Sequence, residues 1–513
     1  MDKKGFVYLV GAGPGDPGLF TLKGKSVLAQ ADVVIYDRLV SSRILSWAPS
    51  EAELIYVGKV SGHHAMQQKE INALLVEKAQ KGKIVVRLKG GDPFLFGRGG
   101  EEALYVRENG LDFEVIPGIT SAIAVPAYAG IPVTHRENTS SLTIVTGHEK
   151  PGKEESSINW AKLSQTKSTL VFLMGVENLE FIVESLLKHG KPSSTPVALI
   201  RWGTLPEQEV LTAMLDDIVD KVKTHDFKPP AVIVVGEVVK LRNTLSWVEN
   251  KPLWGKKIIV TRARAQASGL VEQIASLGGE PIEFPTITIK AETNYTALHN
   301  AFDNIGNYNW LIFTSVNAVE IFFAQLRKAH KDIRHLRDIK ICAIGPATRN
   351  VLEEKGLIVD NMPEEYRAEG ILEELQDKIK AGDWVLLPRA RGARGLLPKA
   401  IKGWGAHVNE IFIYQAVAEP RVSKEMFAEI VAGNIDYITF TSSSTVDNFV
   451  RIVGLDNALR INKKAKIACI GPITADTAKG KGFKVDLIAQ NYTISGLIEA
   501  IIQDVKLQNG EGN

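Results

Sequence analysis

The stretch from Arg87 to Glu102, with the sequence RLKGGDPFLFGRGGEE, constrains the fold of this chain more than any other segment. It follows the β-branched run Ile84–Val86 directly, and it contains five glycines, two arginines and a lysine. Glycine is needed where a backbone bends sharply or approaches a ligand closely. A plain turn needs only two or three such residues. The stretch therefore predicts a ligand-binding loop at the end of a strand, which is where open α/β sheets bind their ligands.

Strand-like and helix-like segments alternate along nearly the whole chain, which predicts an α/β fold with largely parallel sheets. In the first half, a helix is expected to end at about Ala29, and strands are expected at Phe6–Val10, Val33–Ile35, Ile84–Arg87, Ser141–Thr146, Thr169–Leu173, Val197–Arg201 and Ala231–Val235. The alternation breaks between Arg242 and Lys257. We therefore place the main domain boundary near Ser246–Trp254.

The second half contains an internal repeat with an offset of 126 or 127 residues. WLIFTS at 310–315 returns as YITFTS at 437–442, and KICAIGP at 340–346 returns as KIACIGP at 466–472. Tyr366 with Gly370 returns as Tyr492 with Gly496. This half is expected to form two similar α/β lobes. The Thr-Ser pair of each copy either caps a helix only or helps its N-terminus to hold an anion.

Size and composition exclude several classes of protein. The 513 residues suggest about three or four domain-sized units. No apolar run reaches the roughly 18 residues that span a bilayer, and the N-terminus leads directly into a strand, so we expect neither a membrane partner nor a signal peptide. Cys342 and Cys469 are expected to be buried thiols in a reducing cytoplasm, and a structural zinc site would need more ligands. The net charge of +2 gives no indication of a nucleic-acid partner.

Basic residues cluster locally in two places. Each cluster is either a solvated surface or a site for a small polyanionic substrate, because arginine binds carboxylates through two parallel hydrogen bonds. The clusters are Arg87, Lys89 and Arg98, and then Arg389, Arg391 and Arg394.

The loop GAGPGDPG at 11–18 follows the first expected strand. It differs from the dinucleotide fingerprint G-x-G-x-x-G, because its glycines follow a G-x-G-x-G spacing and prolines interrupt the helix start. A nicotinamide site with Asp37 on the ribose remains the alternative. Pro17 speaks against it, since proline removes a helix N–H group that a pyrophosphate would need.

Residues 5–245 resemble the uroporphyrinogen-III C-methyltransferase family. The segments that carry the resemblance are Gly11–Pro17, Tyr36–Val40, Val57–Lys59, Arg87–Glu102, Pro117–Ser121, Thr146–His148 and Met174–Gly175. The resemblance implies a two-lobed tetrapyrrole methylase fold with S-adenosylmethionine as cofactor, and a homodimer formed through this half. By motif, the residues lining the cofactor pocket would be Pro14, Gly90, Gly91, Asp92, Leu95, Thr120, Ser121, Met174, Gly203 and Ala231.

The same resemblance implies catalytic roles for two residues. Asp37 would be the general base that removes a proton from the macrocycle, and Lys59 would be a proton donor; each is otherwise a member of a surface ion pair. Arg87, Lys89 and Arg98 would bind substrate carboxylates. The sequence after Lys59 departs from the family pattern, which usually has a basic residue there. His63 and His64 are expected to be substrate contacts or plain surface and not metal ligands.

Residues 256–505 resemble uroporphyrinogen-III synthase. The matching pieces are GKKIIVTR at 255–262, the two Phe-Thr-Ser blocks, IYQ at 413–415, the two Ile-Gly-Pro blocks and YTISGL at 492–497. The resemblance implies a second two-lobed α/β fold, with an inner lobe at about 290–415, and a cyclisation of hydroxymethylbilane that uses no metal and no cofactor.

This second reaction needs a folded linear substrate and a hydrogen-bond donor near the leaving hydroxyl. Tyr414 is the candidate donor by family match, and the alternative is a Tyr packed at a lobe interface. The donors expected for the substrate carboxylates are Arg262, Ser315, Thr441, Ser442 and Thr474, and we also suspect Arg389 and Arg391.

Together, these observations predict a methyltransferase domain at 1–245, a linker at 246–255 and a synthase domain at 256–505. The expected bifunctional enzyme would make uroporphyrinogen III and methylate it twice to precorrin-2. Two alternatives remain: a nicotinamide-dependent oxidoreductase with a regulatory half, and a methyltransferase joined to a tetrapyrrole-sensing module without catalysis.

Overall fold

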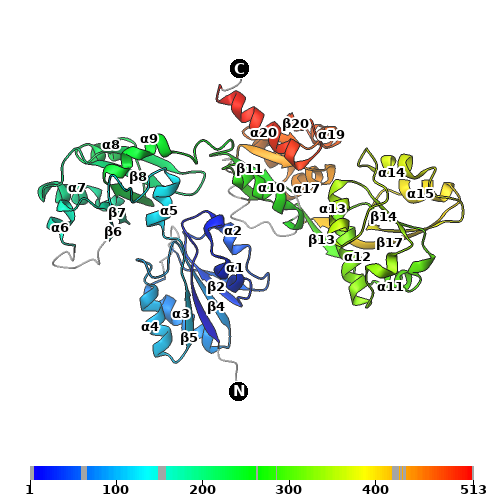
Figure 1. Ribbon diagram of the computed structural model, residues 1–513, viewed down its shortest axis with the longest axis horizontal. Coiled ribbons are helices and arrows are strands. Elements are labelled where there is room, and N and C mark those ends of the chain that lie inside the picture. Colours follow the sequence, from blue (N-terminus) through cyan, green and yellow to red (C-terminus); the bar gives the residue numbers. More distant parts are fainter. Residues whose placement is uncertain are drawn as a thin grey trace. The chain divides into compact units, whose positions relative to one another are not determined.

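The computed structural model describes residues 5–58, 66–147, 158–261, 264–284, 286–418, 427, 430, 432 and 435–510. The chain divides into two compact units (Figure 1). Unit 1 contains Met1–Lys257, Ile274–Glu280 and Val505–Asn513, and unit 2 contains Ile258–Gln273 and Pro281–Asp504. Within the described ranges, none of the helices combines the length and the apolar character needed to span a bilayer.

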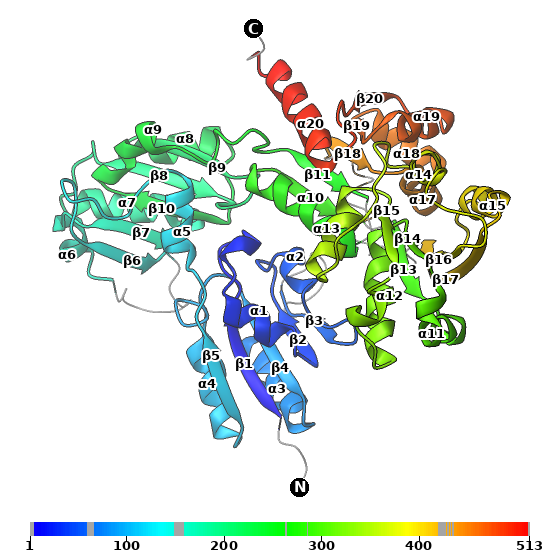
Figure 2. The ribbon, with the colours of Figure 1, turned by 45° about the vertical axis from the view of Figure 1, so that its right-hand side comes forward.

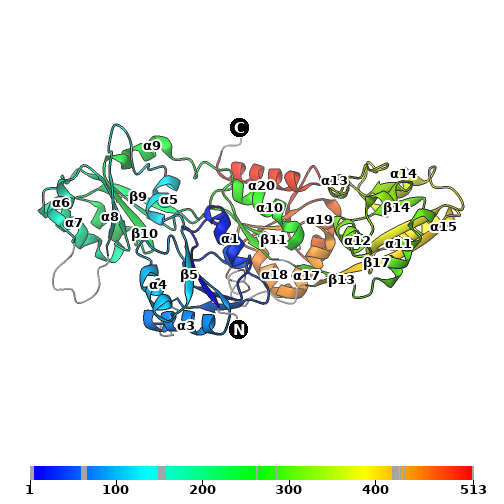
Figure 3. The ribbon, with the colours of Figure 1, turned by 60° about the horizontal axis from the view of Figure 1, so that its bottom comes forward.

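The first sheet of unit 1 has the strand order β3-β2-β4-β1-β5, and all its neighbouring strands are parallel. Its strands are β1 (Phe6–Gly11), β2 (Val33–Tyr36), β3 (Glu53–Tyr56), β4 (Ile84–Lys89) and β5 (Asp112–Ile116). Its helices are α1 (Leu22–Leu28), α2 (Ser42–Leu45), α3 (Gln68–Gln80) and α4 (Gly99–Glu108). Helices α3 and α4 contact each other and lie side by side (Figure 3). Because β1 and β4 are central, the two glycine loops that follow them lie at the same edge of the sheet.

The second sheet of unit 1 has the order β6-β7-β10-β8-β9. Its strands are β6 (Leu142–Thr146), β7 (Thr169–Leu173), β8 (Pro196–Arg201), β9 (Glu209–Met214) and β10 (Ala231–Val235). Only β6 and β7 pair in parallel, and the other three pairs are antiparallel. The expectation of largely parallel sheets is therefore wrong for this one. Its cause is the short connection from β8 to β9, since a tight hairpin joins only antiparallel neighbours.

Helices cover both faces of this second sheet. Side chains of α5 (Ser121–Tyr128) pack on one face, and side chains of α7 (Leu179–Lys188) pack on the other. A sheet buried on both faces explains why its strands consist of continuous apolar runs. The remaining helices of this region are α6 (Trp160–Gln165), α8 (Ile218–Thr224) and α9 (Arg242–Leu245).

Unit 2 contains two more five-stranded sheets, in the orders β12-β11-β18-β19-β20 and β13-β17-β16-β14-β15. The strands of the first are β11 (Lys257–Val260), β12 (Glu280–Glu283), β18 (Tyr437–Phe440), β19 (Lys466–Cys469) and β20 (Val485–Ile488). Those of the second are β13 (Ile287–Ala291), β14 (Trp310–Phe313), β15 (Lys340–Ala343), β16 (Trp384–Ala390) and β17 (His407–Ala418). The second sheet thus comes from one continuous stretch of chain, 287–418.

The helices of unit 2 follow the same order along the chain. They are α10 (Arg264–Ser276), α11 (Thr296–Asp303), α12 (Val316–Lys328), α13 (Pro346–Glu354), α14 (Ala368–Leu375), α15 (Leu396–Gly403), α17 (Ser443–Val453), α18 (Leu455–Asn462), α19 (Pro472–Gly480) and α20 (Ile494–Gln508). Helices α11 and α12 pack on one face of the β13–β17 sheet, and α14 and α15 pack on the other (Figure 2).

The internal repeat is confirmed at the level of the backbone. Ser315 and Ser442 cap α12 and α17 with nearly identical φ and ψ angles, −168° and 155° against −167° and 160°. In each copy an aspartate accepts a hydrogen bond from the second residue of a strand, Asp360 from Ile341 and Asp486 from Ile467. The two copies belong to different sheets, so unit 2 contains two similar α/β lobes.

Candidate active site

A cavity of about 520 Å³ opens in unit 1. Its wall contains the loops that follow β1 and β4, the start of α5, and the chain at the ends of β7, β8 and β10. All ten residues expected to bind the cofactor line it, namely Pro14, Gly90, Gly91, Asp92, Leu95, Thr120, Ser121, Met174, Gly203 and Ala231. Six sequence segments that are far apart along the chain therefore meet at one cavity.

Two glycine loops form the floor of this cavity by bonding to each other. Gly13 N donates to Gly91 O at 3.1 Å, and Gly91 N donates to Gly13 O at 2.7 Å. Both residues have left-handed backbones, with φ of +76° and +69°. Asp92 fixes the second loop, because its carboxylate accepts from the N–H groups of Phe94 and Gly118 at 2.8 and 3.0 Å. Backbone atoms thus line the cavity where side chains would obstruct it.

Three cavity residues that are not glycine also adopt left-handed backbones. They are Phe96, Met174 and Trp202, with φ of 54°, 58° and 46°. Strained backbone of this kind is concentrated at ligand sites. Met174 was expected here, whereas Phe96 and Trp202 were not singled out from the sequence. The signal for Trp202 was its position next to Gly203, and the signal for Phe96 was its place inside the glycine stretch.

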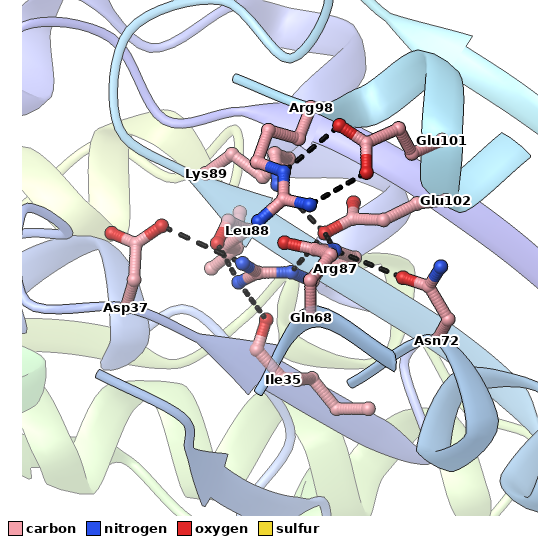
Figure 4. A network of polar contacts seen from close by, with 10 residues as sticks. All are labelled: Ile35, Asp37, Gln68, Asn72, Arg87, Leu88, Lys89, Arg98, Glu101 and Glu102. Carbon is pink, nitrogen blue, oxygen red and sulfur yellow. Dashed lines mark hydrogen bonds and ion pairs between the residues drawn. The ribbon is translucent and has the colours of Figure 1, made fainter. Parts of the chain in front are cut away.

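Asp37 follows β2 and lies beside the cavity, whose wall includes the next two residues, Arg38 and Leu39. One Asp37 oxygen accepts from Leu39 N at 3.1 Å, and the other lies 3.7 Å from Arg87 Nη2 (Figure 4). The Asp37 side chain is about 29% exposed. The carboxylate is therefore both held in place and open to a ligand.

Arg87 and Lys89 do not face the solvent, which differs from their expected role as direct substrate contacts. They are 3% and 4% exposed, and both donate to Oε1 of Glu102 on α4, at 3.3 and 2.7 Å (Figure 4). The reason is their spacing: residues i and i+2 of a strand point to one face, and here that face lies beneath α3 and α4. Burial, followed by the charge of Arg87, lowers the pKa of Lys89.

The other expected groups of the methyltransferase half lie elsewhere. Arg98 is exposed and makes two hydrogen bonds to the carboxylate of Glu101, at 2.9 and 2.6 Å. It does not line the cavity. Lys59, His63 and His64 lie outside the described residues.

In unit 2 the structure brings two expected residues together. The Tyr414 hydroxyl on β17 lies 2.8 Å from the Ser315 hydroxyl at the end of β14. Ser315 also accepts from Ala318 N and so caps α12. Arg389 on β16 is buried, and Glu410 lies 3.3 Å away; burial lowers the pKa of Arg389. Arg391 instead reaches out to Glu292 at 2.8 Å.

The remaining expected residues of unit 2 belong to the other sheet. Ser442 caps α17, and its hydroxyl lies 2.9 Å from that of Ser444. Thr441 is half-buried between β18 and α17, and Thr474 is buried in the first turn of α19. Arg262 lies outside the described residues. Across the ranges that the structure describes, no three His, Cys, Asp or Glu side chains gather as a metal site would require.

Comparison with known proteins agrees with this division. Residues 7–219 match the family model of the tetrapyrrole (corrin/porphyrin) methylases, and residues 268–499 match that of uroporphyrinogen-III synthase HemD. The porphyrin biosynthesis protein HemD of Ruminiclostridium josui is 39% identical over 97% of this chain and 98% of its own. The uroporphyrinogen-III C-methyltransferase of Priestia megaterium is 55% identical over 46% of this chain and 98% of its own.

Solved structures match the first half in the same way. The uroporphyrin-III C-methyltransferase of Thermus thermophilus, in complex with S-adenosyl homocysteine, is 40% identical over 46% of this chain and all of its own, with a TM-score of 0.41. The fold and the cavity define unit 1 as a tetrapyrrole methylase. The chain belongs to the uroporphyrinogen-III C-methyltransferase family in its first half and to the uroporphyrinogen-III synthase HemD family in its second.

Proposed function

We propose that this chain is a bifunctional enzyme of tetrapyrrole biosynthesis. Its second half closes hydroxymethylbilane to uroporphyrinogen III with inversion of the last ring and loss of water. Its first half transfers two methyl groups from S-adenosylmethionine to uroporphyrinogen III and so makes precorrin-2. The observation that carries the proposal is the cavity of unit 1, in which all ten residues implied by the methyltransferase resemblance meet.

The cavity suits S-adenosylmethionine in size and in chemistry. Ligand pockets for molecules of this size have volumes of roughly 300–1,000 Å³, and this one has about 520 Å³. The glycine loops offer backbone groups at close range, Asp92 offers a carboxylate for hydroxyl or ammonium groups, and Met174 offers an apolar, polarizable wall. S-adenosylmethionine, when bound, supplies an electrophilic methyl group.

In this proposal Asp37 is the general base. Its carboxylate lies beside the cavity and is partly exposed, and Arg87 and the N–H of Leu39 orient it. It would take the proton that the macrocycle loses once its carbon has gained the methyl group. Lys59 is the proposed proton donor, and Arg98 a proposed contact for a substrate carboxylate. Arg87 and Lys89 would act from within the protein, by holding Asp37 and Glu102 in place.

For the synthase half, we propose that the Tyr414 hydroxyl donates a hydrogen bond to the departing hydroxyl of hydroxymethylbilane. The C–O bond of the hydroxymethyl group breaks and water leaves, while a pyrrole carbon closes the ring and loses its proton. Ser315 holds the Tyr414 hydroxyl from one side. Arg262, Ser315, Thr441, Ser442 and Thr474 are the proposed donors to the substrate carboxylates.

We also propose the division into a methyltransferase domain at 1–245, a connecting segment at 246–255 and a synthase domain at 256–505. The inner lobe of the synthase domain would span about 290–415. A homodimer formed through the methyltransferase half is proposed as well, and sedimentation of the full chain would test it. The cytoplasm is the proposed location, since the buried thiols of Cys342 and Cys469 suit a reducing compartment.

Incubating the purified full chain with hydroxymethylbilane and S-adenosylmethionine and identifying the products tests the main proposal. A dimethylated type III product, with two equivalents of S-adenosylhomocysteine, is expected. A methylated type I macrocycle alone would leave the second half without synthase activity and would favour a sensing module there. The absence of any methyl transfer to supplied uroporphyrinogen III would overturn the first half of the proposal.

A further inference from the structure

The last turn of α5 is held from outside the helix at three consecutive carbonyl groups. Trp247 Nε1 donates to Ala127 O at 3.0 Å, and Gln208 Nε2 donates to Tyr128 O at 3.4 Å. Arg242 Nη1 donates to Ala129 O at 2.7 Å. The last carbonyls of a helix have no partner within it, so side chains from elsewhere fix the end of α5. Two of the three come from the segment Arg242–Lys251, which we name the strap.

The strap is itself rigidly built. Glu249 accepts hydrogen bonds from Arg242 Nη2 and Ser246 Oγ, at 2.9 and 2.5 Å. Lys251 Nζ lies 5.2 Å from the centre of the Trp247 ring, a cation–π distance. The strap also passes so close to the end of α5 that a Cβ on Gly130 would lie 2.7 Å from the Leu245 backbone. Residues expected to form a linker are therefore anchored to the methyltransferase half.

Tyr128 connects this anchor to the cavity. Its ring lies 5.2 Å from the Trp247 ring in an edge-on arrangement, and its hydroxyl donates to Asp16 Oδ2 at 2.7 Å. Burial, and then the hydrogen bond to Asp16, raise the pKa of Tyr128, so the phenol remains a donor. Asp16 directly follows Gly13–Gly15, which line the cavity.

Asp16 in turn joins the opposite wall. Its backbone N–H donates to Thr204 Oγ1 at 3.1 Å, and Thr204 lies between the cavity residues Gly203 and Leu205. Thr204 has a left-handed φ of +73°, and its own N–H donates to Gln208. One hydrogen-bonded path thus runs from Trp247 through Tyr128 and Asp16 to two walls of the cavity.

We propose that Tyr128 and Trp247 are positioning residues of the methyltransferase half, and that the strap sets the shape of the cofactor cavity through Tyr128 and Asp16. The inference rests on the proposed S-adenosylmethionine site. Neither side chain lines the cavity, so their effect on a bound cofactor is transmitted through Asp16 and Thr204. The segment that leads from the first half to the second is accordingly part of the cofactor site's support and not a free tether.

Titration of the full chain with S-adenosylhomocysteine, well below the unfolding temperature, tests the proposal without turnover. Tyr128→Phe keeps the ring and is expected to weaken binding about tenfold, since a hydrogen bond to a charged group contributes roughly that factor. Trp247→Ala is expected to weaken binding several-fold, and Trp247→Phe, which restores the ring contact, less. Tyr105→Phe on α4 is the matched control, because among the described residues its hydroxyl has no protein partner.

A double variant separates positioning from simple loss of stability. Trp247→Ala is expected to have much less effect on affinity when Tyr128→Phe is already present, because both act through one path. Full additivity of the two effects, or a lower melting temperature with unchanged affinity, overturns the proposal. If the unaltered chain itself binds no S-adenosylhomocysteine, the proposed cofactor site fails, whereas binding that is insensitive to both variants refutes this inference alone.

Discussion

Lys89 Nζ lies 2.7 Å from Glu102 Oε1, and Glu102 is completely buried beneath two helices. The same oxygen also receives Arg87 Nε at 3.3 Å and Gln68 Nε2 at 3.0 Å. One buried carboxylate thus faces two buried cations, and the partly exposed Asp37 completes the balance of charge through Arg87 (Figure 4). The position of the proposed base is therefore coupled to the packing of α3 and α4 against β4.

Glu102→Gln is expected to destabilise the methyltransferase half strongly, by about 3–5 kcal/mol, because it leaves two buried cations without a counter-charge. The measurement is the free energy of the unfolding transition that S-adenosylhomocysteine shifts, since ligand binding identifies the unit that unfolds. Glu101→Gln is the control, because Glu101 is exposed and pairs only with exposed Arg98. Equal changes in the two variants would contradict the buried network.

Asp37→Asn is expected to retain S-adenosylhomocysteine binding and to lose methyl transfer by a factor of roughly 100 or more, the usual contribution of a general base. An amide keeps the size of the side chain and its bond from Leu39 N but accepts no proton. Turnover with uroporphyrinogen III and calorimetric binding are measured on the same samples. Asp112→Asn, at an exposed ion pair with Arg107, is the control. Normal turnover in Asp37→Asn would exclude the proposed role.

The site was predictable from the sequence wherever backbone motifs form it. Gly90, Gly91 and Asp92 follow a strand, and Thr120 and Ser121 begin a helix, so their place at one sheet edge follows from local patterns and the resemblance. The strands Thr169–Leu173 and Ala231–Val235 also have the expected bounds. Such runs do not encode the direction of their neighbours, which is why the mostly antiparallel second sheet was missed.

Charged residues were harder to place. Arg87 and Lys89 look like a surface or a substrate-binding cluster when read in sequence, because their partner Glu102 lies on another element and its burial depends on tertiary packing. The support of the cavity by Tyr128 and Asp16 was likewise invisible, since these residues are 112 positions apart. Tertiary pairing, not local pattern, decides such positions.

Tyr414→Phe is expected to slow formation of uroporphyrinogen III and to raise the share of the type I isomer, because the donor to the leaving hydroxyl is gone while the ring still packs. Ser315→Ala should have a smaller effect, since it only orients that hydroxyl. Tyr308→Phe is the control: Tyr308 precedes β14, whereas Ser315 follows it, and its hydroxyl bonds to Asn409. Isomer ratios from all three variants decide the matter; a normal ratio in Tyr414→Phe would remove its role.

The two thiols should make stability fall at high pH. Burial raises the pKa of both Cys342 and Cys469 to about 12, against a usual 9.0. Between these values the unfolded chain releases protons that the folded chain keeps, so the folded state is penalised as pH rises from about 9 to about 12. A Cys342→Ala, Cys469→Ala variant should lose less stability over this range. A thiol reagent should also label the native chain slowly and the urea-unfolded chain rapidly; rapid native labelling would contradict the burial.

Gly203→Ala is expected to weaken S-adenosylhomocysteine binding at least tenfold, because a Cβ at Gly203 would lie 2.4 Å from Val125 Cγ1. Both residues line the cavity, and a β-branched Val125 on a helix has little freedom to turn away. The added methyl group therefore has to displace α5 or the cavity wall. Val125→Ala in the same chain should restore much of the affinity by making room.

Gly100→Ala is the matched control for this steric effect. Gly100 lies within α4, and nothing approaches within 4 Å of a Cβ built there. Alanine at this position should leave the affinity unchanged and stabilise the helix slightly, since glycine in a helix is destabilising by roughly 0.5–1 kcal/mol relative to alanine. Unchanged affinity in Gly203→Ala, or a loss that Val125→Ala fails to relieve, would mean that contact between α5 and Gly203 does not shape the cofactor cavity.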